Sequence, residues 1–469
     1  MIALPLAVVL GPLTLVALSM VLIIVTIAWL RLHPFFALFG AALFVSLITA
    51  AGQSHSGRFV LATEAVMAEF GSTAGKIGFT IAIASVIGMA LMESGAADKI
   101  IRRLIAFFGE ANAGLALLSC GFLLGIPVFF DTVFFLLVPL ARALSLRTGK
   151  NYLLYVMAIC AGGVITHSTV PPTPGPLAVA ETLRLDLGLS IMGGIAFGII
   201  PALVGLLFAR WINRRSPVPL RETAGSPLHL LGTAASRREE ELPGFWISIA
   251  PVLVPVVLIA GASIIAPIRA VLAPVAVQII EFLGNKNIAL LIGAVIALAC
   301  QARQQKIGMK KIGEMLGAPL ETAGVIILIT SAGGAYGAII AKAGVGDSVR
   351  ALADGIALNY VLLAWVLAAV IRVAQGSATV AMITTASIML SIAGPAGFGV
   401  HSFYIFLAIG YGATTLSWMN DSGFWVIGRL GGLTEGEMLR SWTVLLTIIS
   451  IIGLIEALIA AALWPQLWF

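Results

Sequence analysis

The chain has 469 residues, of which 60% are hydrophobic and only 10% are charged, and its mean hydropathy is +1.08. Soluble domains carry about 25% charged residues, so this composition excludes an ordinary soluble protein. The net charge of +6 is compatible with a nucleic-acid binder, but no run of Lys and Arg is interleaved with aromatic residues. The positive charges lie in short segments between apolar stretches, where they indicate membrane topology.

Repeated apolar segments are long enough to cross about 30 Å of hydrocarbon. The sequence therefore predicts an all-α, polytopic membrane protein. The predicted crossings of the first half lie near residues 13–31, 34–51, 75–93, 152–180 and 190–211. Those of the second half lie near residues 246–264, 286–300, 324–343, 404–428 and 442–462.

Two further apolar segments, 111–141 and 358–390, are each long enough for two half-crossings but not for two full spans. The first begins and ends beside basic residues, so it is expected to enter and leave on the same side. We interpret both segments as re-entrant hairpins with tips near Pro127 and Gly376.

The polar segment 213–244 separates two halves, 1–212 and 245–469, that resemble each other. The stretch STAGKIGFT, from residue 72, aligns without a gap with ETAGVIILI, from residue 321, at an offset of 249 residues. The same offset places GIPVFFDT (125–132) on AQGSATVA (374–381), and Thr166–Pro176 on Thr415–Trp425. Each polar interruption of the first half thus falls on one of the second, which predicts an internal repeat.

The charge of the connecting segments predicts that the two repeats have opposite orientations. Residues 142–150 contain three basic residues, whereas their counterpart 391–399 has no charge. Conversely, residues 301–311 carry four basic residues where the matching segment 52–58 is nearly neutral. A basic side that alternates between repeats is typical of inverted topology. We expect both termini outside and the linker 213–244 in the cytoplasm.

The sequence breaks its own helices at four places: Gly125–Asp131, Thr166–Pro176, Arg372–Thr379 and Ser417–Gly423. Irregular backbone at membrane depth is tolerated only inside protein or beside a wet cavity. Half-helix N-termini attract anions and unpaired carbonyls attract cations. Paired hairpins and paired broken helices therefore predict a transport site near the midplane.

Four ionisable residues lie within these breaks, and such residues are functional candidates by default. Asp131 and Asp421 are either helix N-caps or carriers of a proton or cation. His167 has three readings: proton coupling, substrate binding or a hydrogen bond within a loop. Arg372 either binds a carboxylate or extends to the membrane surface. Gln375, Ser377 and Thr379 offer neutral hydrogen bonds to a polyol or a cation.

Five motifs in order, GIPVFFDTVFFLLVPL, ITHSTVPPTPGP, SAGGAYG, IRVAQGSATVA and MNDSGFW, resemble the gluconate:proton symporter (gluconate permease) family of the ion-transporter superfamily. The resemblance covers nearly the whole chain. It implies a homodimeric elevator-type carrier that takes up gluconate or a related sugar acid with protons across the bacterial inner membrane. The matching motif positions are Asp131, Thr166, His167, Ser168, Gln375, Ser377, Thr379, Asn420 and Asp421.

The residues and the resemblance together predict one site. Its expected substrate-binding residues are Thr166, His167, Ser168, Arg372, Gln375, Gly376, Ser377, Thr379, Asn420 and Ser422. Its expected proton carriers are Asp131, His167 and Asp421. Because these residues form no metal-ligand or cofactor motif, and because Cys120, Cys160 and Cys300 lack CxxC or His-rich spacing, we expect no metal, disulfide or cofactor.

Several other functions remain open from the residues. Sodium coupling is the nearest alternative, since hairpin tips and unwound carbonyls also suit sodium. A membrane-embedded enzyme could use His167 and an aspartate as acid and base, although catalysis needs no inverted duplication. A passive channel would not accumulate substrate. A primary pump is disfavoured because no GxxxxGK[ST] phosphate loop occurs.

Overall fold

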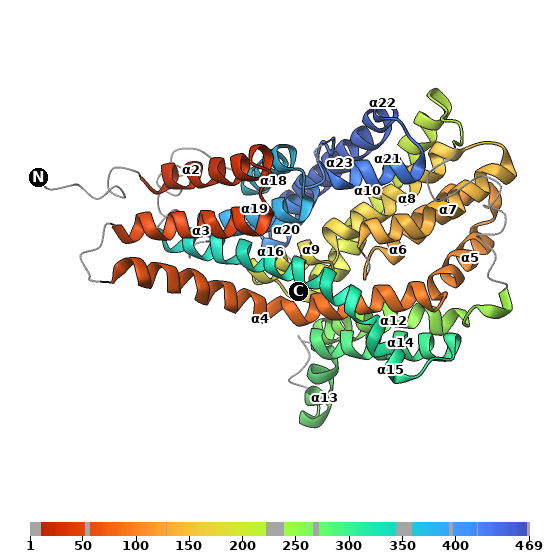
Figure 1. Cartoon of the computed structure of the whole chain (residues 1–469), viewed down its shortest axis with the longest axis horizontal. Helices are drawn as coiled ribbons and strands as arrows, with labels where there is room; N and C mark the ends of the chain where they lie inside the picture. Colours follow the sequence, from red (N-terminus) through yellow and green to blue (C-terminus); the bar gives the residue numbers. More distant parts are fainter. Residues whose placement is uncertain are drawn as a thin grey trace, which may run out of the picture.

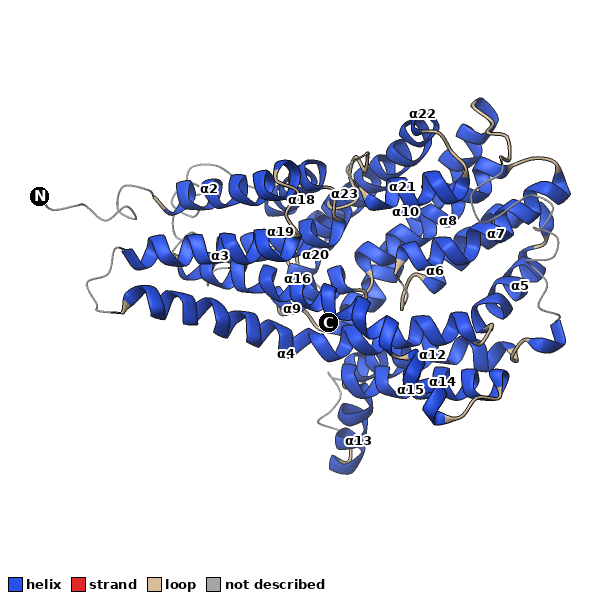
Figure 2. Cartoon of the chain, in the orientation of Figure 1, coloured by secondary structure: helices blue, strands red, loops and turns tan. Residues whose placement is uncertain are grey.

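The computed structural model describes residues 11–51, 57–127, 129–221, 239–265, 272–343, 359–393, 397–419 and 421–466. Every regular element in these ranges is helical (Figure 2), as the composition predicts.

The first half forms a series of helices of very different length. They are α2 (Pro12–Ile24), the π-helix η1 (Val25–Trp29), α3 (Pro34–Ala51), α4 (Arg58–Glu93), α5 (Ala96–Phe108), the 3-10 turn η2 (Glu110–Asn112), α6 (Ala113–Leu124), α7 (Phe130–Thr148), α8 (Tyr152–Thr169), α9 (Pro174–Thr182) and α10 (Leu187–Arg215).

The second half is helical as well. Its elements are the 3-10 turn η4 (Glu239–Glu241), α12 (Phe245–Ile265), α13 (Pro274–Gly284), α14 (Lys286–Gln305), α15 (Met309–Met315), α16 (Gly317–Lys342), α18 (Tyr360–Gln375), α19 (Ala378–Ala393), α20 (Ser402–Gly412), α21 (Ser422–Gly431), α22 (Glu435–Met438), the π-helix η7 (Leu439–Thr443) and α23 (Val444–Leu463).

By length and composition, seven helical segments in the described part of the chain could cross a membrane. They correspond to predicted crossings in both halves, and they extend further than the sequence indicated: α4 begins at Arg58 rather than near residue 75. Other predicted crossings are present as shorter apolar helices, among them α3 and α20. The basic residues Lys99, Arg102 and Arg103 lie in the amphipathic helix α5.

Both predicted hairpins are helix–turn–helix units. Helix α6 contacts α7, and α18 contacts α19. Pro127 lies in the turn between the first pair, and Gly376, with φ of +88°, ends α18. A positive φ at this position favours glycine, which has no Cβ to clash.

The helices bury two main apolar clusters. One joins α2, α3 and α16, with Leu38, Val45 and Tyr336 at its centre. The larger joins α6, α8, α10, α20 and α23 with the hairpins. In Figure 1, α2, α3 and the first part of α4 lie beside α16 at the end of the molecule that contains the N-terminus, and α6, α7 and α8 lie beside one another at the other end.

Helices α6 and α8 approach each other so closely that their backbones nearly touch. A Cβ built on Gly162 would lie 2.1 Å from the carbonyl oxygen of Leu118 and 2.7 Å from the amide nitrogen of Phe122. Small residues permit this kind of contact between membrane helices. The first hairpin is therefore fixed to the helix that ends in the predicted break at Thr166.

We expect Gly162→Ala to destabilise the protein, because the added methyl group meets backbone atoms that cannot rotate away. Overpacking of this kind costs about 1–3 kcal/mol, so the melting temperature of the detergent-solubilised protein should fall by several degrees. Gly75→Ala in α4 is the matched control, since a Cβ there meets nothing within 4 Å. Equal melting temperatures for the two variants would contradict the α6–α8 packing.

Candidate functional site

A cavity of about 370 Å³ lies where the hairpins and the broken helices meet. Seven of the residues predicted from the sequence line it: Asp131, His167, Ser168, Arg372, Ser377, Thr379 and Asp421. They come from α7, α8, α18, the α18–α19 turn, α19 and the start of α21. Segments more than 200 residues apart in the sequence therefore contribute to one space.

The break in the first half is shorter than predicted. Helix α8 continues to Thr169, so Thr166, His167 and Ser168 lie in its last turns rather than in irregular backbone. The irregular part is residues 170–173, with a cis peptide bond between Pro171 and Pro172. The predicted break begins at Thr166, whereas α8 continues to Thr169 and ends just before the two prolines.

Of these three residues, two face the cavity. His167 and Ser168 line it, and His167 Nδ1 and Ser168 Oγ are buried without a hydrogen-bond partner among the described residues. Thr166 is fully buried, and its hydroxyl donates to the backbone carbonyls of Gly162 and Gly163 at 3.3 and 3.4 Å. Thr166 therefore stabilises the end of α8 and does not line the cavity.

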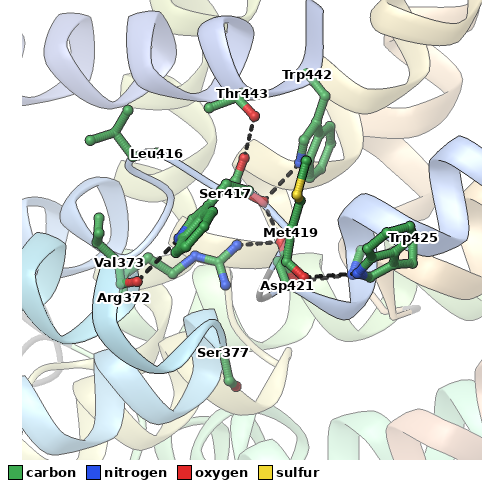
Figure 3. Close-up of polar contacts among 12 residues, drawn as sticks. Arg372, Val373, Ser377, Leu416, Ser417, Met419, Asp421, Trp425, Trp442 and Thr443 are labelled. Carbon is green, nitrogen blue, oxygen red and sulfur yellow. Dashed lines mark hydrogen bonds and ion pairs between the residues drawn. The ribbon is translucent and has the colours of Figure 1, made fainter. Parts of the chain in front are cut away.

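Arg372 is only 4% exposed and lies in the last turn of α18. It forms an ion pair with Asp421 through Nη2, so it does not extend to a membrane surface. Its Nε and Nη1 are buried and have no hydrogen-bond partner among the residues that the structure describes. In Figure 3 the unpaired terminal nitrogen points away from Asp421, toward the side on which Ser377 lies.

Gly376, four residues after this arginine, caps the C-terminal end of α18. Its N–H donates to the carbonyl of Arg372 at 2.9 Å, which closes the last turn of the helix. Gln375 is the final residue of α18, and its side chain lies outside the described part of the structure, as do the side chain of Ser422 and the whole of Asn420.

Asp421 accepts three hydrogen bonds and is 8% exposed. Its Oδ1 accepts from the N–H of Gly423 at 2.9 Å, so it caps α21 as predicted. Its Oδ2 accepts from the hydroxyl of Ser417 and from Arg372. Ser417 in turn accepts from the indole N–H of Trp442 at 2.7 Å (Figure 3).

Asp131 lies in an entirely different environment. It is in the first turn of α7, whose N-cap is Phe129, so the prediction that Asp131 is itself a cap is wrong. Its side chain is exposed and lines the cavity. It makes no hydrogen bond and no ion pair with the residues described here, although it lies within electrostatic range of Asp421.

The aromatic wall of the cavity was not predicted from the sequence. The rings of Phe130 and Trp442 stack with centroids 5.7 Å apart and an angle of 23° between their planes, and both line the cavity. Trp442 stands in an apolar segment, where an aromatic residue is unremarkable. Ser417 was included in a predicted break but had no assigned role, because its link to Trp442 depends on tertiary packing.

Comparison with known proteins identifies the family of the chain. The sequence model described as GntP family permease matches residues 11–463. The chain belongs to the GntP family of permeases. It is thus a multi-pass membrane transporter, and not an enzyme.

Related sequences match along almost their whole length. The chain is 32% identical over 453 residues to the Gnt-II system L-idonate transporter of Escherichia coli K12. The alignment covers 95% of this chain and 98% of that protein. The chain is 30% identical over 447 residues to the gluconate permease of Bacillus subtilis, with 94% and 98% covered. It is 32% identical over 446 residues to the gluconate permease of Pseudomonas aeruginosa, with 93% and 94% covered.

Two solved structures share the fold. The YdaH transporter of Alcanivorax borkumensis superposes with a TM-score of 0.64 at 14% identity, over 92% of this chain and 99% of that chain. Neisseria gonorrhoeae MtrF, an antimetabolite efflux pump, superposes with a TM-score of 0.67 at 14% identity, over 93% and 96%. At this identity the comparison establishes the fold and nothing further.

The cavity can be tested by cysteine labelling. Cys120, Cys160 and Cys300 are all buried, so the wild-type protein should react only slowly with a small, charged methanethiosulfonate reagent. Thr379→Cys, placed at the cavity wall, should react readily. Thr385→Cys is the matched control on the same helix, since Thr385 is fully buried. Equal labelling of both variants would contradict a cavity on the Thr379 side of α19.

Proposed function

We propose that the protein is a secondary active transporter that takes up gluconate or a related sugar acid together with protons. Relatives of this chain are named for gluconate and L-idonate transport, and both substrates combine a carboxylate with several hydroxyl groups. The cavity offers chemistry for each part.

The observation that carries the proposal is the state of Arg372. A buried guanidinium with two unpartnered nitrogens at the wall of a cavity is a strong site for an oxyanion, because charged hydrogen bonds to carboxylates are short and directional. Asp421 neutralises part of the charge but occupies one nitrogen only. The carboxylate of the sugar acid would bind to the others.

The remaining polar groups of the cavity suit a polyol. Ser168, Ser377, Thr379, Thr322 and Thr414 place hydroxyl groups around the space, and a hydroxyl both donates and accepts. The Phe130–Trp442 pair provides an apolar surface against which the C–H face of an extended sugar acid would pack. Ligand pockets commonly combine such a surface with a few polar groups.

Proton coupling is supported by the titratable groups that face the cavity, Asp131, His167 and Asp421. The described residues contain no cluster of three His, Cys, Asp or Glu side chains, but sodium can be bound by neutral oxygens alone. Sodium coupling is therefore the alternative that the experiment below must separate. The same proposal includes two inverted repeats, an elevator movement, a homodimer in the bacterial inner membrane, external termini and a cytoplasmic linker.

Uptake of labelled gluconate into sodium-free proteoliposomes tests the proposal directly. We expect accumulation when an inward proton gradient is applied, and collapse of that accumulation when a protonophore is added. The control is an inward sodium gradient without a proton gradient, which should give no accumulation. Accumulation that requires sodium would overturn proton coupling, and accumulation of another carboxylate in place of gluconate would overturn the substrate.

Arg372→Lys should raise the KM for gluconate by roughly tenfold to a hundredfold, since a hydrogen bond to a charged group contributes about 1.5–3 kcal/mol and Lys lacks the planar fork. The maximal rate should change less than the KM. Arg103→Lys on α5 is the matched control, because Arg103 is exposed and distant from the cavity lining. An unchanged KM for Arg372→Lys would contradict the proposed contact between Arg372 and the carboxylate.

A further inference from the structure

We propose that the two aspartates of the cavity have different roles: Asp421 is a positioning residue that fixes Arg372, and Asp131 is the carboxyl group that carries the transported proton. The inference rests on the proposed function, since it assigns steps within it. It follows from a contrast between the two carboxylates: Asp421 accepts three hydrogen bonds, whereas Asp131 is exposed to the cavity and accepts none from the described residues.

The surroundings of Asp421 suit a permanent anion. Its two oxygens receive a backbone N–H, a serine hydroxyl and a guanidinium N–H. A proton on Oδ2 would place an O–H against the guanidinium of Arg372, which can only donate. Breaking such a buried pair leaves an uncompensated charge on Arg372, which is strongly unfavourable.

The position of Asp421 is fixed by a chain of contacts behind it. The indole N–H of Trp442 donates to Ser417 Oγ at 2.7 Å, and the hydroxyl of Thr443 donates to the Ser417 carbonyl at 2.5 Å. Trp442 is 2% exposed and stacks on Phe130. Ser417 therefore holds Asp421, and Asp421 holds one edge of Arg372. The other nitrogens of the guanidinium are left without a hydrogen-bond partner among the described residues.

Asp131 has the properties of a group that gains and loses a proton. Its side chain is exposed to the cavity and makes no hydrogen bond or ion pair within the described residues. It lies in the first turn of α7, where the helix dipole tolerates the ionised form. Water in the cavity can deliver a proton to Asp131 without breaking any contact seen in the structure.

The charges around the cavity couple proton and substrate. Facing Asp131 are Arg372 from α18, Asp421 at the start of α21, and His167 from α8. Arg372 and Asp421 form a neutral pair, so an ionised Asp131 repels a second carboxylate that approaches Arg372. A proton on Asp131 removes this repulsion. By linkage, each ligand raises the affinity for the other to the same extent.

The test compares Asp131→Asn with Asp421→Asn in proteoliposomes. For Asp131→Asn we expect loss of proton-driven gluconate accumulation, retention of exchange of labelled for unlabelled gluconate, and an exchange rate that no longer depends on pH between 5 and 8. For Asp421→Asn we expect a KM raised roughly tenfold or more, with accumulation at saturating gluconate still abolished by a protonophore and the pH profile unchanged.

Two milder variants test the positioning role in case Asp421→Asn does not fold. Trp442→Phe keeps the ring stack and removes the N–H to Ser417, and Ser417→Ala removes the donor to Asp421. Both should raise the KM without loss of coupling. Trp365→Phe, which loses an indole bond to Ser450 Oγ of 2.9 Å away from the cavity lining, should leave the KM unchanged. Glu64→Gln, an exposed acid on α4, should leave coupling unchanged.

Each outcome decides between the roles. Proton-driven accumulation by Asp131→Asn, or exchange without accumulation by Asp421→Asn, would overturn the assignment. So would loss of pH dependence in His167→Gln with Asp131 intact. If the wild-type protein fails to accumulate gluconate in a proton gradient, the proposed function fails instead. Calorimetric titration of gluconate would then still test positioning, since the Ser417, Trp442 and Asp421 variants must all weaken binding.

Discussion

The buried ion pair between Arg372 and Asp421 is the interaction on which the rest of the site depends. A charged side chain at membrane depth is costly unless it is paired or solvated, and Arg372 is 4% exposed. Its pairing with Asp421 requires that the C-terminal end of α18 lies beside the N-terminal end of α21. Helix α18 stops at Gly376, and α21 starts immediately after Asp421. One ion pair thus joins the second hairpin to the second broken helix.

The helix breaks are stable because their backbone groups find partners. Gly376 closes α18 through its N–H, Thr173 donates to the carbonyls of Val170 and His167, and Thr443 donates to that of Ser417. Inside a membrane protein these groups cannot rely on bulk water. The hydroxyl groups of Thr173 and Thr443 therefore stabilise two of the breaks.

The sequence predicted where the chain breaks but not what the broken ends contact. Prolines 171 and 172, Gly376 and the charges within apolar segments marked three of the breaks to within a few residues, because these residue types act locally. The extent of α4 and the helical state of α5 were missed, since charged residues on an amphipathic helix resemble a loop in a hydropathy profile. The pairing of Arg372 with Asp421 and the stack of Phe130 on Trp442 depend on tertiary packing, which a single sequence does not encode in any short pattern.

The ionisable groups of the cavity are distributed unequally between the two halves of the chain. At the offset of 249 residues that aligns the polar interruptions, Asp131 corresponds to Val380, and Arg372 corresponds to Leu123. Likewise Asp421 corresponds to Pro172 and His167 to Leu416. The interruptions recur, whereas the ionisable groups do not. The second half supplies the ion pair between Arg372 and Asp421, and the first supplies Asp131 and His167. Under the proposed function, this division would let one half hold the anion while the carboxyl group of Asp131 in the other half gains and loses a proton, because neither role has to be shared by equivalent positions.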